Sequence, residues 1–478
     1  MQKPARSKGE SHLLRACFCI FPLSSPKMKC LLFFITVLLA TIANAQTLTE
    51  KTFKFDAEAE AILSLKASSP GADWATKDAE AAVVTLEVDG KYNQDVILFS
   101  GAENFEYRVL LGRFAAGEHK LRITLNSSQS ASNAKKAVVN AATITPNKID
   151  NKLESLMHAH APILYARPDT VGKFSDLPVL MWYEIIHEGT TNTIRYSIIF
   201  TNEDGGTQTA ALMARWGRVT DIEWICEIKF DEQGKIVSEV FQGTNHRTLP
   251  FAGRYEAQHP VYIVASRNNN FSDQLPENLP ALRFALAPVA FDTAHNSREV
   301  LMDQNPWTYR LMYDEMLREG KIATDAEVIG AAGLGIKMLD PRRYLYFDGS
   351  STNTNSALSF AVKLKGDAKW YASDLGQSYF RIDRSGWFRS TVRLPKINHT
   401  NQIEQIVVRC EALPDTQARK QDFKPEPTCA IETINKIFLL DEKFTPSASM
   451  QLKVKNTPLR FGEMLEIFRR DVTRRKGR

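Results

Sequence analysis

The sequence has few cysteines, little excess charge of either sign and no late hydrophobic run that could span a membrane. Six of the 478 residues are cysteine and the formal net charge is +5. Beyond residue 46 no apolar run approaches the roughly 20 residues that a spanning helix needs. No C-x-x-C pair is present, so the common zinc modules are not expected. A hydrophobic fraction of 44% and a charged fraction of 24% are those of an ordinary globular protein, which excludes extensive disorder.

The usual catalytic signatures are also missing. The sequence contains no G-x-S-x-G elbow, P-loop, H-E-x-x-H pair or dinucleotide fingerprint, so no standard motif indicates an enzyme class. The basic end "RRDVTRRKGR" (469–478) is interpreted as a solvated tail, and no nucleic-acid partner is expected. The length predicts two or three domains.

The first 45 residues are predicted to be a leader. Residues 27–45 combine a lysine-bearing start, an apolar run and the small-residue ending Ala43-Asn44-Ala45, which is the pattern of a cleavable secretory signal. The mature protein is therefore expected to be secreted or periplasmic. Three cysteines lie in the leader, and in an oxidising compartment Cys410 and Cys429 are the natural disulfide pair. Cys226 follows the apolar side of a strand and is interpreted as a buried free thiol.

The remaining chain predicts a mainly all-β fold of tandem β-sandwich domains with one helical insertion around 305–333. Short alternating runs separated by turns such as Asp89-Gly90, without intervening helices, indicate sandwiches. The expected parts are an accessory, carbohydrate-binding-like sandwich (47–148), a central sandwich (153–290), a helical connection (291–340), a C-terminal β domain (341–465) and a basic tail (466–478).

The stretch "RWGRVTDIEW" (215–224) reads as a strand with two carboxylates, Asp221 and Glu223. Side chains two residues apart on a strand point to the same face, so these acids are expected to stand together. Either they face water or they hold a cation, unless Arg215 or Arg218 neutralises them.

A resemblance follows from the order of motifs around this stretch: "HAPILYARPDT" (160–170), "RYSIIFTN" (195–202), "GTNH" (243–246) and "HPVYIVASRNNNFSD" (259–273). This order resembles the vacuolar-protein-sorting family numbered sixty-two, in which a "GDWE"-centred strand lies between similar segments. The acidic strand is also similar to the heptapeptide Gly-His-Arg-His-Asp-Trp-Glu of the necrosis-inducing proteins, which are secreted sandwiches that hold a divalent metal and bind glycolipid heads.

Position by position, the resemblance places Gly217 at the glycine of that heptapeptide and Asp221 and Glu223 at its acidic pair. Arg218 and Thr220 replace its two histidines, which puts a transition-metal site in doubt. His246 matches the histidine of a neighbouring loop, and Asn269 or Asn270 stands where relatives have another histidine. The resemblance covers about 115 of the 478 residues.

Oxygen ligands favour hard cations, so Asp221 and Glu223, with Glu203 and Asp204 from the turn "TNEDGGT", are candidate ligands for Ca²⁺. The same turn is equally a plain hairpin turn with exposed acids. Two further histidines, His158 and His160 in "HAH", would share a strand face.

Four residues are candidates for acid–base catalysis: Tyr183, Glu184, His187 and His246. Tryptophan and tyrosine beside polar residues, as in "RWGRVTDIEW", favour sugar contacts instead, because aromatic faces stack on sugar rings. The function expected is binding of carbohydrate or glycolipid at a surface. The alternatives are a secreted polysaccharide lyase or glycoside hydrolase, and a structural envelope protein.

Overall fold

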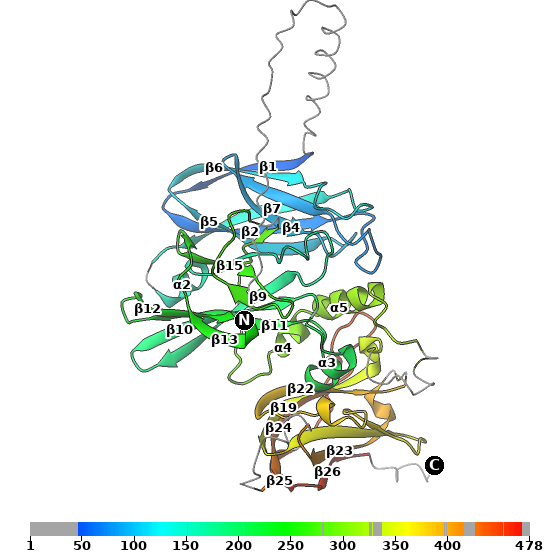
Figure 1. Ribbon diagram of the computed structural model, residues 1–478. Helices are drawn as coiled ribbons and strands as arrows, with labels where there is room; N and C mark the ends of the chain where they lie inside the picture. The colour runs from blue at the N-terminus through cyan, green and yellow to red at the C-terminus, as the bar shows by residue number, and fades with distance from the viewer. Residues whose placement is uncertain are drawn as a thin grey trace, which may run out of the picture. The chain divides into compact units, whose positions relative to one another are not determined.

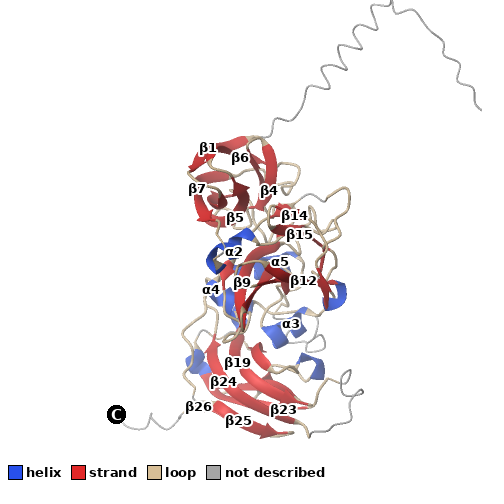
Figure 2. Cartoon of the chain, turned by 90° about the vertical axis from the view of Figure 1, so that its left-hand side faces the viewer, coloured by secondary structure: helices blue, strands red, loops and turns tan. Residues whose placement is uncertain are grey.

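The computed structural model describes residues 46–470 except 151, 204, 280–281, 325–326, 328–336, 396, 398, 415–425 and 453. The expected signal at 27–45, Asp204, and residues 471–478 of the expected basic tail lie outside the described residues. From Thr47 onward the chain forms one compact unit. Strands dominate its described part, and the predicted all-β class with several separate sheets is confirmed (Figures 1 and 2). No helix in the described ranges has the length and apolarity to cross a bilayer.

The first seven strands form two sheets around their own core. Their order is β1-β6-β3-β4 in one sheet and β5-β2-β7 in the other. The hairpin between β3 and β4 turns at Asp89 and Gly90, whose φ values of 52° and 74° are those that a two-residue hairpin loop requires. The strands are β1 (Thr47–Phe55), β2 (Ala59–Ser68), β3 (Val83–Val88), β4 (Lys91–Ile97), β5 (Phe105–Phe114), β6 (Gly117–Leu125) and β7 (Val138–Lys148).

The central residues build one eleven-stranded mixed sheet. Its order is β17-β8-β15-β16-β12-β11-β10-β9-β18, with β13 beside β12 and β14 beside β15. A single hydrophobic cluster includes buried residues of β8, β10, β11, β12 and β15, so strands far apart in the sheet order share one core. The strands are β8 (Ile163–Tyr165), β9 (Pro178–Glu188), β10 (Thr191–Phe200), β11 (Ile222–Phe230), β12 (Ile236–Gly243), β13 (Arg247–Pro250), β14 (Tyr255–Glu256), β15 (His259–Val264), β16 (Phe271–Ser272), β17 (Arg283–Phe284) and β18 (Val289–Ala290).

The helices of the described chain are short. Helix α5 (Trp307–Arg318) is the helix predicted within 305–333, and it buries Tyr309, Met312 and Met316 at the expected spacing. The other α-helices are α2 (Leu153–Ala159), α3 (Thr209–Trp216) and α4 (Val300–Gln304), and the 3₁₀ turns are η1 (Thr244–His246), η2 (Pro341–Arg343), η3 (Ser378–Phe380) and η4 (Thr400–Gln402).

Helix α3 corrects the prediction of a strand over 215–224. The segment "TAALMARW" is rich in good helix formers, and the helix ends at Gly217, which adopts the left-handed φ of 64° typical of a C-terminal cap. Strand β11 therefore starts at Ile222, directly after Asp221. The prediction that His158 and His160 share a strand face is also wrong. His158 lies in helix α2, and His160 directly follows the end of that helix.

The C-terminal strands form a second pair of sheets, β22-β19-β24-β25 and β21-β20-β23-β26. Phe347 of β19 stacks on Phe360 of β20 at 4.3 Å between ring centroids. The predicted disulfide between Cys410 of β23 and Cys429 of β24 is confirmed, and it connects the two sheets. The strands are β19 (Tyr344–Thr354), β20 (Ala357–Leu364), β21 (Trp370–Ala372), β22 (Gly386–Arg393), β23 (Ile403–Glu411), β24 (Thr428–Phe438), β25 (Lys455–Arg460) and β26 (Met464–Arg469).

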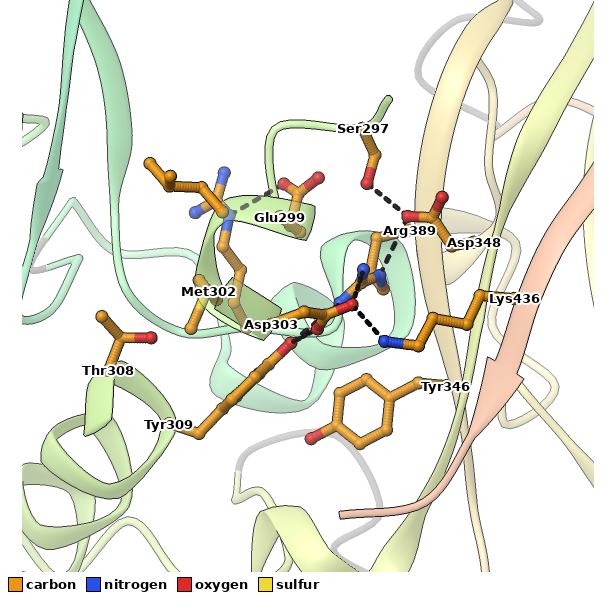
Figure 3. Close-up of polar contacts among 12 residues, drawn as sticks. Ser297, Glu299, Met302, Asp303, Thr308, Tyr309, Tyr346, Asp348, Arg389 and Lys436 are labelled. Carbon is orange, nitrogen blue, oxygen red and sulfur yellow. Dashed lines mark hydrogen bonds and ion pairs between the residues drawn. The ribbon is translucent and has the colours of Figure 1, made fainter. Parts of the chain in front are cut away.

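A buried ionic network joins the C-terminal sheet to the helices (Figure 3). The fully buried Arg389 of β22 donates two hydrogen bonds of 3.0 Å to Asp303 of α4 and one of 3.1 Å to Asp348 of β19. Lys436 also donates to Asp303, and Arg389 donates to the hydroxyl of Tyr309. Because every charge has a partner, the network tolerates burial and fixes α4 on the C-terminal sheet.

Candidate functional site

Polar side chains gather where β10 ends and β11 begins. In the register of the sheet, Ile198 and Ile199 of β10 lie opposite Glu223 and Ile222 of β11. The end of β12 lies beside this position, and its last residue pairs with Phe271 of β16. We call the cluster formed there the polar end of the central sheet; its side chains are Asp176, Asp221, Glu223, Gln242, His246 and Asn269.

Asp221 is held by donors on both of its oxygens. Its Oδ1 accepts a hydrogen bond from the backbone N–H of Ile222 at 2.9 Å, and its Oδ2 accepts one from Asn269 Nδ2 at 3.0 Å. The same amide nitrogen reaches Asp176 Oδ1 at 3.2 Å. Asn269 is fully buried, and its Oδ1 has no hydrogen-bond partner among the described residues. The cluster therefore contains an acceptor oxygen that no described donor satisfies.

Glu223 is linked to the protein surface through a glutamine and a histidine. Gln242 Nε2 donates to Glu223 Oε2 at 2.6 Å, and it also lies 2.6 Å from His246 Nδ1. His246 Nδ1 is 3.7 Å from Glu223 Oε2, while Asn268 Nδ2 lies 2.7 Å from the other ring nitrogen. About half of the His246 side chain is exposed, whereas Glu223 is buried. His246 is thus the solvent-exposed member of this hydrogen-bonded chain.

The two carboxylates resist ionisation. Burial, followed by the charges of Glu223 and Glu203, raises the pKa of Asp221 from its ordinary 3.8 to about 7. Burial likewise raises the pKa of Glu223 to about 7, against the opposing hydrogen bond from Gln242. Near neutral pH each of the two carboxyl groups is therefore protonated part of the time. A cation that replaced these protons would stabilise the two carboxylates.

Neither arginine considered from the sequence forms an ion pair with these acids. Arg215 pairs with Asp383 at 2.7 Å, and the buried Arg218 pairs with Glu299 at 3.0 Å. The charge of Arg218 still lowers the pKa of both Asp221 and Glu223 from a distance. The guanidinium group of Arg218 thus favours the ionised form of both acids without forming an ion pair with either.

The backbone around the polar end is strained. Asp176, Asn245, His246 and Asn269 all have positive φ, between 49° and 60°. Left-handed backbone costs on the order of 1 kcal/mol at each such residue, and Asn and Asp accept it more readily than His. Strain of this kind concentrates at binding and catalytic sites. The loop after β10 also approaches closely, because a Cβ on Gly205 would lie 2.6 Å from Asn268 Oδ1.

The structure separates the catalytic candidates. His246 lies beside Glu223, but His187 sits at the other end of β9, where it faces Asn192. Asn192 lies six positions before Ile198, the β10 residue opposite Glu223, and six positions span roughly 20 Å along a strand.

Glu184 and Tyr183 also lie away from the polar end. Glu184 accepts a hydrogen bond from Arg195 at 2.8 Å and one from Thr293. Burial raises the pKa of its neighbour Tyr183. The four candidates therefore do not form one acid–base group.

The histidines His158 and His160 and the thiol Cys226 lie outside the polar end and are largely buried. His160 is buried against Phe230 at 5.1 Å, and burial lowers the pKa of its imidazole to about 4. The half-buried His158 also has a lowered pKa, chiefly through desolvation. Cys226 is a buried free thiol, as predicted.

The donor set fits a hard cation better than a transition metal. Across the described ranges, no group of three or more His, Cys, Asp or Glu side chains is arranged to hold a metal ion. Asp221 and Glu223, with Glu203 close enough to raise the pKa of both, offer carboxylate oxygens. Asn269 Oδ1 and Gln242 Oε1 are buried and have no hydrogen-bond partner in the part of the chain that the structure describes. Calcium accepts such a mixture of carboxylate, amide and water oxygens.

The sequence analysis did not predict Asp176 and Gln242 as members of the polar end, because no motif marks them. Asn269 was indicated only through the resemblance.

No protein-family model matches the chain, and no curated protein is significantly similar to it. The resemblance to the vacuolar-sorting and necrosis-inducing families therefore remains an expectation.

Proposed function

We propose that the protein binds carbohydrate or the sugar head of a glycolipid at the polar end of the central sheet, with a calcium-like cation at Asp221 and Glu223. The observation that carries the proposal is the pair of buried carboxylates, both with a pKa near 7, beside the Asn269 oxygen, which no described residue satisfies. A cation there would satisfy these oxygens and expose a charge to sugar hydroxyls next to His246.

The leader supports this proposal. A secretory signal at 27–45 would deliver the protein to a compartment in which extracellular modules bind Ca²⁺ with dissociation constants of about 10⁻⁴ to 10⁻³ M. Cation binding must displace the proton that the pair holds, so we expect the Ca²⁺ affinity to rise between pH 6 and pH 8.

The test is a titration of Ca²⁺ into the chelator-treated protein, followed by thermal unfolding at both pH values. We expect Ca²⁺ to raise Tm more at pH 8 than at pH 6, and Asp221→Asn to remove the increase. Glu232→Gln, at an exposed position between β11 and β12, is the matched control. A glycan array with and without chelator tests the second half. A Tm that Ca²⁺ leaves unchanged at both pH values would contradict the proposed cation site. An array that retains no glycan would contradict the proposed carbohydrate binding.

A second candidate function is acid–base cleavage of a polysaccharide. It is favoured by the 3.7 Å approach of His246 Nδ1 to Glu223, whose pKa near 7 suits a group that exchanges protons at neutral pH. Incubation with uronate-containing and neutral polysaccharides, read by reducing ends and by absorbance of unsaturated products, tests it. Activity that survives both Glu223→Gln and His246→Ala would contradict this site.

A further inference from the structure

A separate cleft lies between the end of α3, the loop before α4 and the loop before β22. It has a volume of about 290 Å³. Its position is fixed by hydrogen bonds of 2.6 Å from Ser390 to the carbonyl of Ala214 and from Thr391 to the carbonyl of Met213, which hold α3 against β22. The residues that matter for its chemistry are Arg215, Trp216, Arg298, Arg384 and Trp387.

The cleft carries an excess of positive charge. Four arginines and two carboxylates line it, a difference of two charges. Arg215 is neutralised by Asp383, and Arg389 is neutralised by the network of Figure 3. The other carboxylate, Glu299, already pairs with Arg218. The excess therefore resides on the two remaining arginines.

Arg298, from the loop before α4, and Arg384, from the loop before β22, both line the cleft, and neither has a carboxylate within ion-pair distance in the part of the chain that the structure describes. Arg298 donates one hydrogen bond, to the carbonyl of Ile222 at 3.0 Å. Its five N–H donors leave most of its capacity unused. Burial lowers its pKa, against the raising effect of the charges of Glu299, Glu223 and Asp221. Arg384 is exposed. Because the Arg298 guanidinium is removed from water while most of its donors are unused, it favours an anionic ligand as its partner.

Trp387 supplies a fixed aromatic surface beside these charges. Its indole N–H donates to the carbonyl of Ala294 at 2.7 Å, so the ring is anchored while it remains half-buried at the cleft. The second tryptophan, Trp216, is contacted by the guanidinium groups of Arg215 and Arg218, at 4.8 and 5.9 Å from its ring centroid. Trp387 is therefore the ring on which a ligand would stack.

We propose that this cleft binds an acidic sugar residue, with its carboxylate between Arg298 and Arg384 and its ring against Trp387. The combination of a planar two-donor group for the carboxylate and an aromatic surface for the apolar face of the sugar is what a uronate needs. The cleft and the polar end of the central sheet have no lining residue in common, although Arg298 is close enough to Asp221 and Glu223 for their charges to raise its pKa, and the cleft needs no cation. It extends the proposed carbohydrate binding to an acidic ligand.

The test is titration of the full chain with oligogalacturonate in excess chelator, read by tryptophan fluorescence and by calorimetry. Neutral oligosaccharide of equal length and inorganic phosphate are the comparison ligands. We expect oligogalacturonate to bind at least tenfold more tightly than either, and Arg384→Ala and Trp387→Ala each to weaken it about tenfold or more. Arg460→Ala, an exposed arginine of the same domain outside the cleft, should bind normally.

The outcomes separate this proposal from the first one. Binding of phosphate as tight as that of oligogalacturonate would show a simple anion site and overturn the assignment of a sugar. Equal binding of the neutral oligosaccharide, or an unchanged affinity in Arg384→Ala, would also overturn it. Because chelator is present throughout, failure of the cation at Asp221 leaves this result unaffected, and the exposed Glu232→Gln variant should bind oligogalacturonate as the unmodified protein does.

Discussion

Replacing Asp221 with asparagine tests whether ionisation of this buried carboxyl lowers the free energy of unfolding. In the unfolded chain this carboxyl ionises near 3.8, whereas in the folded protein its pKa is about 7. A group whose folded pKa is raised stabilises the fold while it is protonated, and this stability is lost as pH rises toward the folded pKa. The unmodified protein should therefore lose stability between pH 5 and pH 8 in the presence of chelator.

The size of the loss follows from the shift. Each pKa unit is worth about 1.4 kcal/mol, and roughly two units of the window between the two pKa values lie above pH 5, so the loss is on the order of 3 kcal/mol. This is an upper figure, since Glu223 shares the same proton. Asparagine cannot ionise, so the Asp221→Asn variant should lack this part of the pH dependence.

The comparison between two pH values removes the other effect of the substitution. Both oxygens of Asp221 accept hydrogen bonds, from the N–H of Ile222 and from Asn269, and an asparagine can accept only one of them. That cost, about 1 to 3 kcal/mol, is the same at pH 5 and pH 8 and cancels in the difference.

The assay is urea unfolding in chelator at pH 5 and pH 8, with Glu232→Gln as the control that should follow the unmodified protein. Relative to the unmodified protein, Asp221→Asn should gain up to about 3 kcal/mol on going from pH 5 to pH 8. Parallel pH profiles for the unmodified protein and the variant would refute the reasoning, because they would mean that Asp221 is ionised at little cost.

Three further changes probe the scaffold by urea unfolding. Asp303→Ala leaves the fully buried Arg389 without its two-bonded partner and should cost about 3 to 5 kcal/mol; a loss below about 1 kcal/mol would contradict a role of the network in stability. Cys410→Ser with Cys429→Ser opens a 19-residue loop and should cost about 3 kcal/mol, whereas an unchanged midpoint would show that the link between the sheets is dispensable. Gly217→Ala forces a Cβ to 2.8 Å from Arg389 Cγ at a φ of 64° and should cost more than about 1 kcal/mol; Gly366→Ala, at an exposed turn position with a φ of 75° and open space around the added Cβ, is the comparison.

Local patterns were sufficient to predict the fold class. Alternating runs and turns such as Asp89-Gly90 depend on neighbours in sequence, and they predicted the β character of both terminal regions, 47–148 and 341–465. Helix α3 was missed because its eight residues are too few for a helical period, although the alanine-rich "TAALMARW" followed by glycine was an available signal. The order of the central sheet depends on pairings such as β8 with β15, nearly 100 residues apart, which no local pattern specifies.

The polar end could be predicted only where its residues are close in sequence. Asp221 and Glu223 are two positions apart, and the charge of Glu223 raises the pKa of Asp221. Asn269 and Asp221 are 48 positions apart, and Gln242 and Glu223 are 19 apart. Their meeting depends on how β12 and the loop after β15 are placed beside β11, which is set by the packing of the whole sheet.

Asn269 combines a left-handed backbone with hydrogen bonds to both Asp221 and Asp176. Its φ of 49° suits asparagine and aspartate alike, so Asn269→Asp changes the charge with little change in backbone strain. The new carboxylate would face Asp221 and Asp176 without the amide protons that now bridge them. In chelator at pH 8 the variant should therefore unfold at a lower temperature than the unmodified protein, because a third buried acid adds repulsion.

With Ca²⁺ the same substitution should act in the opposite sense, since a further charged oxygen strengthens a calcium site. The increase in Tm on adding Ca²⁺ should thus be larger for Asn269→Asp than for the unmodified protein. Asn269→Gly removes the side chain while permitting the same φ, so it should lose the hydrogen bonds and show no enhanced response. If Asn269→Asp is destabilised equally with and without Ca²⁺, the oxygens of the polar end do not converge on a cation, and their raised pKa values reflect burial alone.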